Sequence, residues 1–217
     1  YLIDGVPQSN PLRDGSREGY TIDPFFVDRV EVIFGSNAIQ GIGATGGVVN
    51  YATVAPAVDA DRWSGRLLAQ FGADGDFRGD SESSRLGVLV ARDFGRIDLA
   101  TGVAWQSRGV FYDGDGRRIG VDGTQGEVQD SESLSLFLKA GLELGAERRL
   151  ELMAQQFELE GNGEYVVVPG SRVAGRPASA VRGVNPGVIP TNTVRTASLT
   201  YTDTALLGGR LTAQAFL

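Results

Sequence analysis

The sequence predicts a mostly all-β fold in which antiparallel strands cross a membrane. Its 31 glycines and 8 prolines, out of 217 residues, separate short apolar runs and exceed their usual combined share of about 12 %. Apolar and polar residues alternate with a period of two in the clearest runs. The connections between the runs alternate between long and short, which is typical of a bacterial membrane β-barrel.

The composition excludes several kinds of site from this chain. It contains no cysteine and no histidine, which removes disulfides, thiol nucleophiles, the commonest general base and the commonest metal ligand. The net charge of −7 disfavours a nucleic-acid partner, because phosphate binding needs a basic surface. No nucleophile and base can be paired from the remaining side chains, so we expect neither an enzyme nor a cofactor. No run approaches the roughly 18 apolar residues of a membrane-spanning helix.

The first 56 residues contain shorter expected strands and more closely spaced turns than the rest of the chain. Residues 1–7 read as a strand that enters a Gly-Pro turn. Residues 22–29 read as a short helix, with Asp23 as its N-cap and Pro24 in its first position. Two further strands are expected at 30–33 and 48–51. Tight turns are expected at Gly35, Gly41, Gly43, Gly46 and Gly47, where a positive φ or a close backbone approach is needed.

Seven strands are expected after residue 56. In 63–71, 97–105 and 134–144, apolar side chains occupy one face and polar or small ones the other. Weaker examples at 85–92, 150–157, 196–204 and 210–217 complete the set. Trp63, Phe71 and Trp105 stand where the aromatic girdles of a barrel are expected.

The six connections between these strands alternate in length. Long gaps at 73–84, 108–132 and 158–195 are separated by short ones at 93–96, 145–149 and 207–209. A soluble sandwich has no reason to alternate in this way, whereas a barrel joins its strands by periplasmic turns and longer extracellular loops. Seven strands would leave open edges, so we expect the sequence to be truncated at both ends.

Three motifs in residues 1–54 resemble the plug of the TonB-dependent outer-membrane receptors. They are Tyr-Leu-Ile-Asp-Gly-Val-Pro, Ile-Asp-Pro-Phe-Phe-Val-Asp-Arg-Val-Glu-Val and Ala-Thr-Gly-Gly-Val-Val-Asn-Tyr-Ala-Thr. The plug-motif residues of this chain are Asp4, Gly5, Asp23, Pro24, Arg29, Glu31, Gly35, Gly46, Gly47 and Asn50. The resemblance implies that 1–56 is the C-terminal part of a plug domain. It also implies that 57–217 is the first seven strands of a barrel of about 22 strands.

The resemblance also implies a function. It is the active import of a ferric siderophore, or a similar scarce nutrient, across the bacterial outer membrane. The implied partners are a TonB-type inner-membrane energy-coupling protein that binds upstream of this chain, outer-membrane lipid, and a siderophore-like iron chelate. The barrel is expected to be monomeric. Two alternatives stay open: a receptor of the same family for cobalamin, sugar or peptide, and a soluble secreted β-domain for adhesion or carbohydrate binding, with 134–144 in its core.

The expected ligand-binding residues lie in the loop 8–20. Arg13 and Arg17 suit an anionic siderophore, and Tyr20 suits its catecholate or hydroxamate face. The alternative for this loop is a solvated segment with ordinary surface charges. Arg29 and Glu31 are expected to orient the plug against the barrel.

Other polar residues carry weaker expectations. Arg66, Asp98, Lys139 and Glu143 fall on the polar face and are expected to line the lumen. The run 113–116, Asp-Gly-Asp-Gly, fails the calcium-loop pattern afterwards, so no metal site is expected. Departures from the family pattern are Phe34 in place of arginine, Gly35-Ser36 in place of Gly-Pro and Ile39-Gln40-Gly41 in place of Leu-Tyr-Gly.

Overall fold

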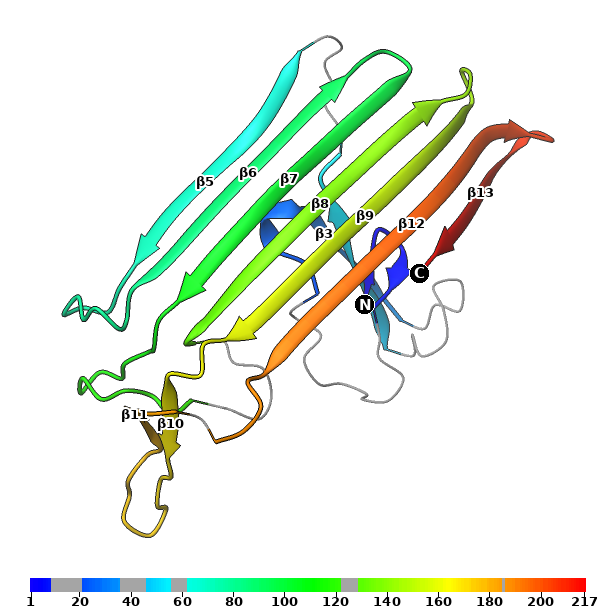
Figure 1. Cartoon of the computed structure of the whole chain (residues 1–217). Helices are drawn as coiled ribbons and strands as arrows, with labels where there is room; N and C mark the ends of the chain where they lie inside the picture. The colour runs from blue at the N-terminus through cyan, green and yellow to red at the C-terminus, as the bar shows by residue number, and fades with distance from the viewer. Residues whose placement is uncertain (9–20, 36–45, 56–61, 122–128, 185) are drawn as a thin grey trace.

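The computed structural model describes residues 1–8, 21–35, 46–55, 62–121, 129–184 and 186–217. A four-stranded sheet, here the N-terminal sheet, lies against one face of a tilted seven-stranded sheet, here the wall (Figure 1). A third, two-stranded sheet projects beyond one end of the wall (Figure 1). The predicted mostly all-β fold is confirmed.

The N-terminal sheet has the spatial order β2-β1-β4-β3. Its strands are β1 (Leu2–Ile3), β2 (Val6–Pro7), β3 (Val27–Phe34) and β4 (Gly47–Thr53). β1 and β4 run parallel, and the other two pairs are antiparallel. One turn of 3₁₀-helix, η1 (Pro24–Phe26), leads directly into β3.

The wall is antiparallel throughout, and its strands follow chain order apart from the inserted hairpin. Its strands are β5 (Trp63–Gly72), β6 (Ser83–Asp93), β7 (Ile97–Arg108), β8 (Ser131–Glu143), β9 (Arg148–Gly161), β12 (Thr191–Leu206) and β13 (Gly209–Phe216). β10 (Tyr165–Val168) and β11 (Ser179–Arg182) pair as a hairpin between β9 and β12. The seven predicted strands are therefore present, and those flanking the third long gap extend further into it than expected.

Two local predictions near the N-terminus were wrong. Residues 1–7 form two strands instead of one, because Asp4 and Gly5 both have positive φ (46° and 81°) and close a two-residue turn. Asp-Gly is the preferred sequence for that turn, and Pro7 is tolerated because β2 is an edge strand.

The helix expected at 22–29 is also shorter than predicted. Asp23 caps it as expected, accepting a hydrogen bond from Phe25 N at 2.8 Å, but Val27 is already extended (φ −88°, ψ 129°). From Val27 onward the chain pairs with β4, with a bulge between Val27 and Arg29. Alternating Val and Ile side chains favour that pairing over further helix.

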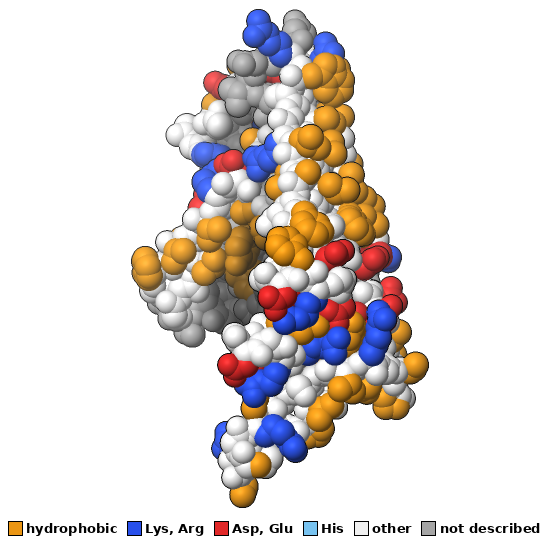
Figure 2. All heavy atoms as spheres, turned by 90° about the vertical axis from the view of Figure 1, so that its left-hand side faces the viewer, with side chains coloured by type: hydrophobic (Ala, Val, Ile, Leu, Met, Phe, Trp, Pro, Cys, Tyr) orange, Lys and Arg blue, Asp and Glu red, His pale blue; other side chains and the backbone are white. Residues whose placement is uncertain are grey.

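The two faces of the wall differ as the alternation predicts. Leu67, Leu134 and Leu136 are exposed on the face turned away from the N-terminal sheet, and Leu67 keeps 78 % of its surface. Ser135, Phe137 and Lys139, which alternate with those leucines in β8, are buried. Figure 2 shows hydrophobic side chains along the outward face. The leucines of 134–144 thus lie outside, so the soluble domain with these residues in its core is excluded.

The main apolar core lies between the two sheets. Ile3, Phe25 and Phe26 of the N-terminal part pack with Leu89, Ala100, Phe137 and Met153 of the wall. The boundary predicted between residues 56 and 57 falls within 56–61, which lie outside the described residues. That division stays a prediction.

Candidate functional site: the sheet interface and the long loops

Two aromatic side chains of η1 seat the N-terminal sheet on the wall. Phe26 is fully buried, and its ring stacks on that of Phe137 in β8, with centroids 5.0 Å apart and planes 13° apart. Phe25 meets Phe26 edge-on at 5.4 Å. A Cβ added to Gly102 would lie 2.7 Å from Phe26 Cε1, and one added to Gly87 would lie 3.1 Å from the Phe25 ring. These two glycines therefore make room for the aromatic rings.

Lys139 ties the turn Asp4-Gly5 to the wall. Its Nζ donates to Asp4 Oδ2 at 3.0 Å and to Thr53 Oγ1 at 3.1 Å, and it lies 3.5 Å from Glu151 Oε1. Asp4 also accepts from Thr53 N at 2.9 Å. Lys139 is buried, and a buried cation needs such partners to offset its lost hydration. Lys139 was expected only to line the lumen; it binds the N-terminal sheet.

Asp23 makes a second ionic contact between the sheets. Its carboxylate pairs with the guanidinium of Arg85 in β6 while it caps η1. Arg66 Nη1 donates to Phe25 O at 3.3 Å, and Gln155 Nε2 donates to Thr21 O at 2.9 Å. The loop end next to η1 is thus held by side chains of three wall strands.

Arg29 and Glu31, expected to orient the plug, bind each other within the N-terminal sheet. The Nη2 of Arg29 lies 2.7 Å from Glu31 Oε1, and Asn50 Nδ2 donates to Glu31 Oε2 at 2.8 Å. Asn50 Oδ1 accepts from Gly5 N at 3.0 Å. The hydrogen bonds from Asn50 and then Arg29 lower the pKa of Glu31. Among the described residues, the ionic contacts to the wall come from Asp4 and Asp23 instead.

The remaining motif residues have backbone roles. Pro24 occupies the first turn of η1. Gly35 (φ 88°) and Gly47 (φ 142°) adopt conformations that other residues avoid, and a Cβ on Gly47 would lie 2.6 Å from Ile33 O. Gly46 has open space around it. Phe34 is 89 % exposed at the end of β3. Arg13, Arg17 and Tyr20 lie outside the described residues, so their ligand-binding role stays a prediction.

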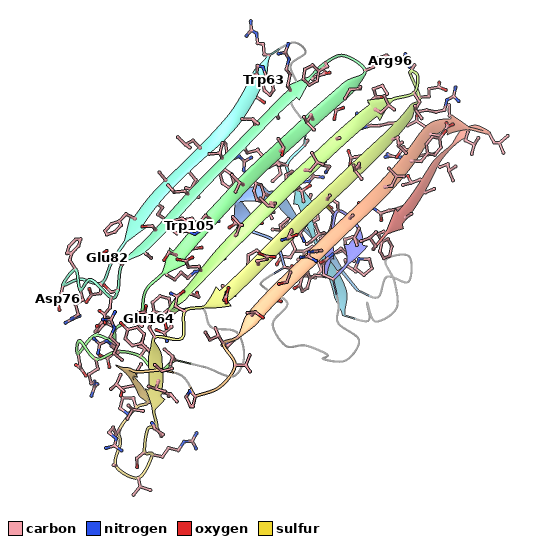
Figure 3. The ribbon with its side chains drawn as sticks, viewed as in Figure 1. Trp63, Asp76, Glu82, Arg96, Trp105 and Glu164 are labelled. Atoms are coloured by element: carbon pink, nitrogen blue, oxygen red, sulfur yellow. The ribbon has the colours of Figure 1, made fainter. Side chains whose placement is uncertain are left out.

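The other residues expected in the lumen lie near the short-turn end of the wall. Arg149 pairs with Asp98 at 2.5 Å and with Glu143 at 2.6 Å. Figure 3 shows Trp63 and Arg96 at this end and Asp76, Glu82 and Glu164 at the opposite end, where the long connections lie.

The long connections are joined to one another at Asp80, which follows β5. We call 73–82, 109–130 and 162–190 the long loops. Tyr112 and Arg118, from the second long loop, donate to Asp80 through the phenol at 2.7 Å and through Nε and Nη2 at 2.8 and 2.7 Å. Tyr165, from the third, donates its phenol to Asp80 Oδ2 at 3.1 Å. One carboxylate thus receives donors from two loops other than its own.

These contacts set the protonation of the long-loop cluster, defined as Asp80, Tyr112, Arg118 and Tyr165. Burial acts to raise the pKa of Asp80, but the hydrogen bonds from Tyr112, Arg118 and Tyr165 outweigh it and lower the pKa. Burial, followed by the hydrogen bonds to Asp80, raises the pKa of both tyrosines. Asp80 is therefore ionised and both phenols keep their protons at neutral pH.

An open pocket borders this cluster. It encloses about 440 Å³ and is lined by Arg78, Tyr112, Gly116, Arg117, Arg118, Ser179 and Ala180. The carboxylates of Asp113 and Asp115 both pair with Arg117. In the part of the chain that the structure describes, no group of three or more histidine, cysteine, aspartate or glutamate residues is arranged to hold a metal.

Sequence reasoning did not find the long-loop cluster. Its four members stand in three loops that no local pattern connects; Asp80 is 32 residues from Tyr112 and 85 from Tyr165. The run Arg117-Arg118 is the only local signal, and it does not reveal that the two side chains turn to different carboxylates.

Among the described residues, no helix is long and apolar enough to cross a membrane.

Comparison with known proteins shows what the chain is similar to. Residues 1–48 match the TonB-dependent Receptor Plug Domain. Over 99 % of its length the chain is 32 % identical to the ferric aerobactin receptor of Klebsiella pneumoniae, and over 98 % it is 29 % identical to the rhizobactin receptor of Rhizobium meliloti (strain 1021). The chain spans about 29 % of the length of each of these relatives.

A solved structure agrees with the fold. The FrpB iron transporter from Neisseria meningitidis (F3-3 variant) superposes with a TM-score of 0.64 at 21 % identity. The match covers 90 % of this chain and 29 % of that one. The fold of this chain is therefore one that a longer iron transporter also contains.

Proposed function

Since residues 1–48 match the TonB-dependent Receptor Plug Domain, we propose that the chain is part of a receptor of that family, which imports a ferric siderophore across the bacterial outer membrane. Residues 1–56 are the C-terminal part of its plug, and 57–217 are the first seven strands of its barrel. The observation that carries this proposal is the N-terminal sheet seated by Phe25 and Phe26 on the polar face of the wall, while the opposite face is apolar. That is how a plug occludes a membrane barrel.

The substrate class comes from the relatives. The names of both relatives are those of siderophore receptors, and the similarity extends over nearly the whole chain. Ligand contacts are assigned to Arg13, Arg17 and Tyr20 and to the long loops, which carry three arginines around one pocket. A TonB-type protein supplies the energy and binds upstream of residue 1. The role is transport without chemistry on the ligand.

Uptake by the intact receptor tests this proposal. The full-length protein is expressed in an iron-starved bacterium that lacks its own siderophore receptors, with and without a functional TonB. We expect TonB-dependent accumulation of radioactive iron from a ferric siderophore, and no accumulation in the strain without TonB. Accumulation that is equal in both strains would contradict the proposal.

Competition separates the substrates within the family. Purified full-length receptor is presented with labelled ferric siderophore and an excess of unlabelled competitor. Iron-loaded siderophore should displace the label and the iron-free form should do so poorly. Displacement by cobalamin, an oligosaccharide or a peptide instead would identify the alternative substrate class.

A further inference from the structure

We propose that Glu151 of β9 competes with Asp4 for Lys139, so that the ionic contact between the N-terminal sheet and the wall is exchangeable. Lys139 pairs with Asp4 while the sheet is seated on the wall, and with Glu151 once the sheet has moved away. The inference rests on the proposed function, because an importer must open a path past its plug. It adds to that function a wall residue that makes the movement less costly.

Lys139 lies between two carboxylates that belong to different sheets. Its Nζ is 3.0 Å from Asp4 Oδ2 in the N-terminal sheet and 3.5 Å from Glu151 Oε1 in the wall. In the pairing of β8 with β9, Lys139 lies opposite Met153, and Glu151 is two positions before Met153 on the same face of β9. Lys139 and Glu151 are therefore neighbours within the wall, and they stay neighbours when the N-terminal sheet moves.

Asp4 keeps partners of its own when it leaves the wall. Its carboxylate accepts hydrogen bonds from Thr53 N at 2.9 Å and from Thr53 Oγ1 at 2.5 Å. Thr53 belongs to β4, so both bonds move with the N-terminal sheet. Release therefore leaves Asp4 with donors and Lys139 with a carboxylate. A charge without a partner is the main cost of breaking a buried ion pair, and here that cost is reduced on both sides.

Glu151 is available to Lys139 because the arginine beside it has other partners. Arg149 Nη2 lies 3.6 Å from Glu151 Oε2. Its Nη1 lies 2.5 Å from Asp98 and 2.6 Å from Glu143, so two other carboxylates neutralise this guanidinium. Glu151 can therefore approach Lys139 through Oε1 while its second oxygen stays near Arg149.

A cavity beside Glu151 gives water access to the exchange. It encloses about 480 Å³, and its lining includes Glu151 and Thr200. Gln214 Nε2 donates to Thr200 Oγ1 and to the carbonyl of Asp4, at 3.1 Å in each case, so the cavity adjoins the turn that carries Asp4. Glu151 keeps 31 % of its side-chain surface exposed, whereas Lys139 keeps 8 %. The cavity therefore leaves room for water to replace Asp4 as the turn withdraws.

The competition gives Glu151 an effect opposite to that of an ordinary stabilising contact. In the seated state Glu151 attracts Lys139 but repels Asp4, since the two carboxylates share one ammonium group. After release only the attraction remains. Glu151 therefore favours release, and its neutralisation should hold the sheet more firmly. Removal of a residue that only stabilises the interface would loosen the sheet instead.

Release of the N-terminal sheet by urea tests the exchange in the full-length receptor. A fluorophore on a cysteine introduced into the N-terminal sheet reports its release from the wall, and the shift in gel mobility on heating shows that the barrel stays folded. We expect the equilibrium constant for release to fall about tenfold in Glu151→Gln, which is within the range of couplings between neighbouring charges. Glu151→Asp, which keeps the charge on a shorter side chain, should fall between Glu151→Gln and the wild type.

Glu158→Gln is the matched control. It removes a carboxylate from the same strand, but this side chain is 42 % exposed and lies 3.9 Å from Arg195. Its release curve should coincide with that of the wild type. An equal shift in Glu158→Gln and Glu151→Gln would mean that any loss of negative charge from β9 has this effect, and would overturn the inference.

The Asp4→Asn background supplies a second arm. Without the carboxylate of Asp4, Glu151 has no competitor and becomes the carboxylate that neutralises Lys139 in the seated state. In this background Glu151→Gln should make release easier, so the effect of the same substitution changes sign. Unchanged or easier release in Glu151→Gln alone, or the same sign in both backgrounds, contradicts the exchange. If Glu151→Gln does not fold, Glu151→Asp decides, and release as easy as in the wild type counts against the exchange.

The two proposals fail separately, because the release assay needs no siderophore. If radioactive iron from a siderophore is imported but Glu151→Gln releases the sheet as easily as the wild type, the function stands and the exchange is wrong. If the shift appears and changes sign in the Asp4→Asn background while no siderophore is imported, the exchange stands and the siderophore function is wrong. Where both hold, Glu151→Gln should lower the uptake rate severalfold and leave the affinity for the siderophore unchanged.

Discussion

Lys139 Nζ lies 3.0 Å from Asp4 Oδ2, which joins a turn at the start of the chain to a strand of the wall 135 residues later. Both groups are largely withdrawn from water, with 8 % and 15 % of their side-chain surfaces exposed. The chain contains one lysine, and it is placed here. This ion pair and the stacking of Phe26 on Phe137 hold the same end of the small sheet, because Thr53, which bonds to Asp4 and Lys139, pairs with Val27.

Replacing Lys139 by Gln should loosen the N-terminal sheet. Removal of one member of a buried pair leaves Asp4 without its cation and costs about 3–5 kcal/mol. The free energy of unfolding is measured on the full-length receptor with a fluorophore on a cysteine introduced into the N-terminal sheet. The double variant Asp4→Asn/Lys139→Gln should lose less than the sum of the single variants, because the two changes share one contact.

Arg195→Gln is the control for that experiment. Arg195 lies 3.9 Å from Glu158 with 69 % of its side chain exposed, so its loss should change stability by less than about 1 kcal/mol. Equal effects at Lys139 and Arg195 would show that the Asp4 contact does not hold the sheet.

Gly102→Ala should disturb the aromatic seat. The added Cβ would lie 2.6 Å from Val88 O in β6 and 2.7 Å from Phe26 Cε1, so both the neighbouring strand and the ring must shift, and overpacking of this kind costs roughly 1–3 kcal/mol. Gly87→Ala, with the Phe25 ring at 3.1 Å, should cost less. Gly75→Ala, which has open space, should leave the unfolding curve unchanged. The expected loss in the free energy of unfolding therefore decreases in the order Gly102→Ala, Gly87→Ala, Gly75→Ala. This order tests whether the glycines make room for the Phe25 and Phe26 rings.

Acidification should weaken the N-terminal sheet through Glu31. The hydrogen bond from Asn50, followed by that from Arg29, lowers the pKa of Glu31 below its ordinary value of 4.5. A lowered folded-state pKa contributes stability that is present above the unfolded value and is lost as the pH falls through the folded value. Melting temperatures of wild type and Glu31→Gln should therefore converge at acid pH. A constant difference across the pH range would contradict the assignment.

Asp80→Asn should release the long loops from one another. The neutral amide leaves Arg118 without its carboxylate and is a weaker acceptor for both tyrosines. We expect trypsin to cleave after Arg117 and Arg118 roughly tenfold faster, since that factor corresponds to about 1.4 kcal/mol in local opening. Asp115→Asn, which removes only an exposed partner of Arg117, should leave the cleavage rate near that of the wild type.

The strands of the wall were predictable because apolar and polar residues alternate within each strand. This pattern can be recognised without knowing which strand pairs with it. The short strands around Asp4 and the early end of η1 were not, since the capping pattern Asp23-Pro24 is the same for a 3₁₀ turn and for an α-helix. The pairing of β3 with β4 decides between them. The contacts of Lys139 and Asp80 depend on which strands become neighbours, and a single sequence does not contain that information in any local window.

The long-loop cluster around Asp80 also affects how the sequences of the long loops can change in evolution. A substitution there alters three loops at once, whereas Val173, in the connection between β10 and β11, is completely exposed. Sequence variation and tolerated insertions, including epitope tags, should therefore be concentrated at the hairpin tip. The residues around Asp80 should either be substituted together or stay unchanged.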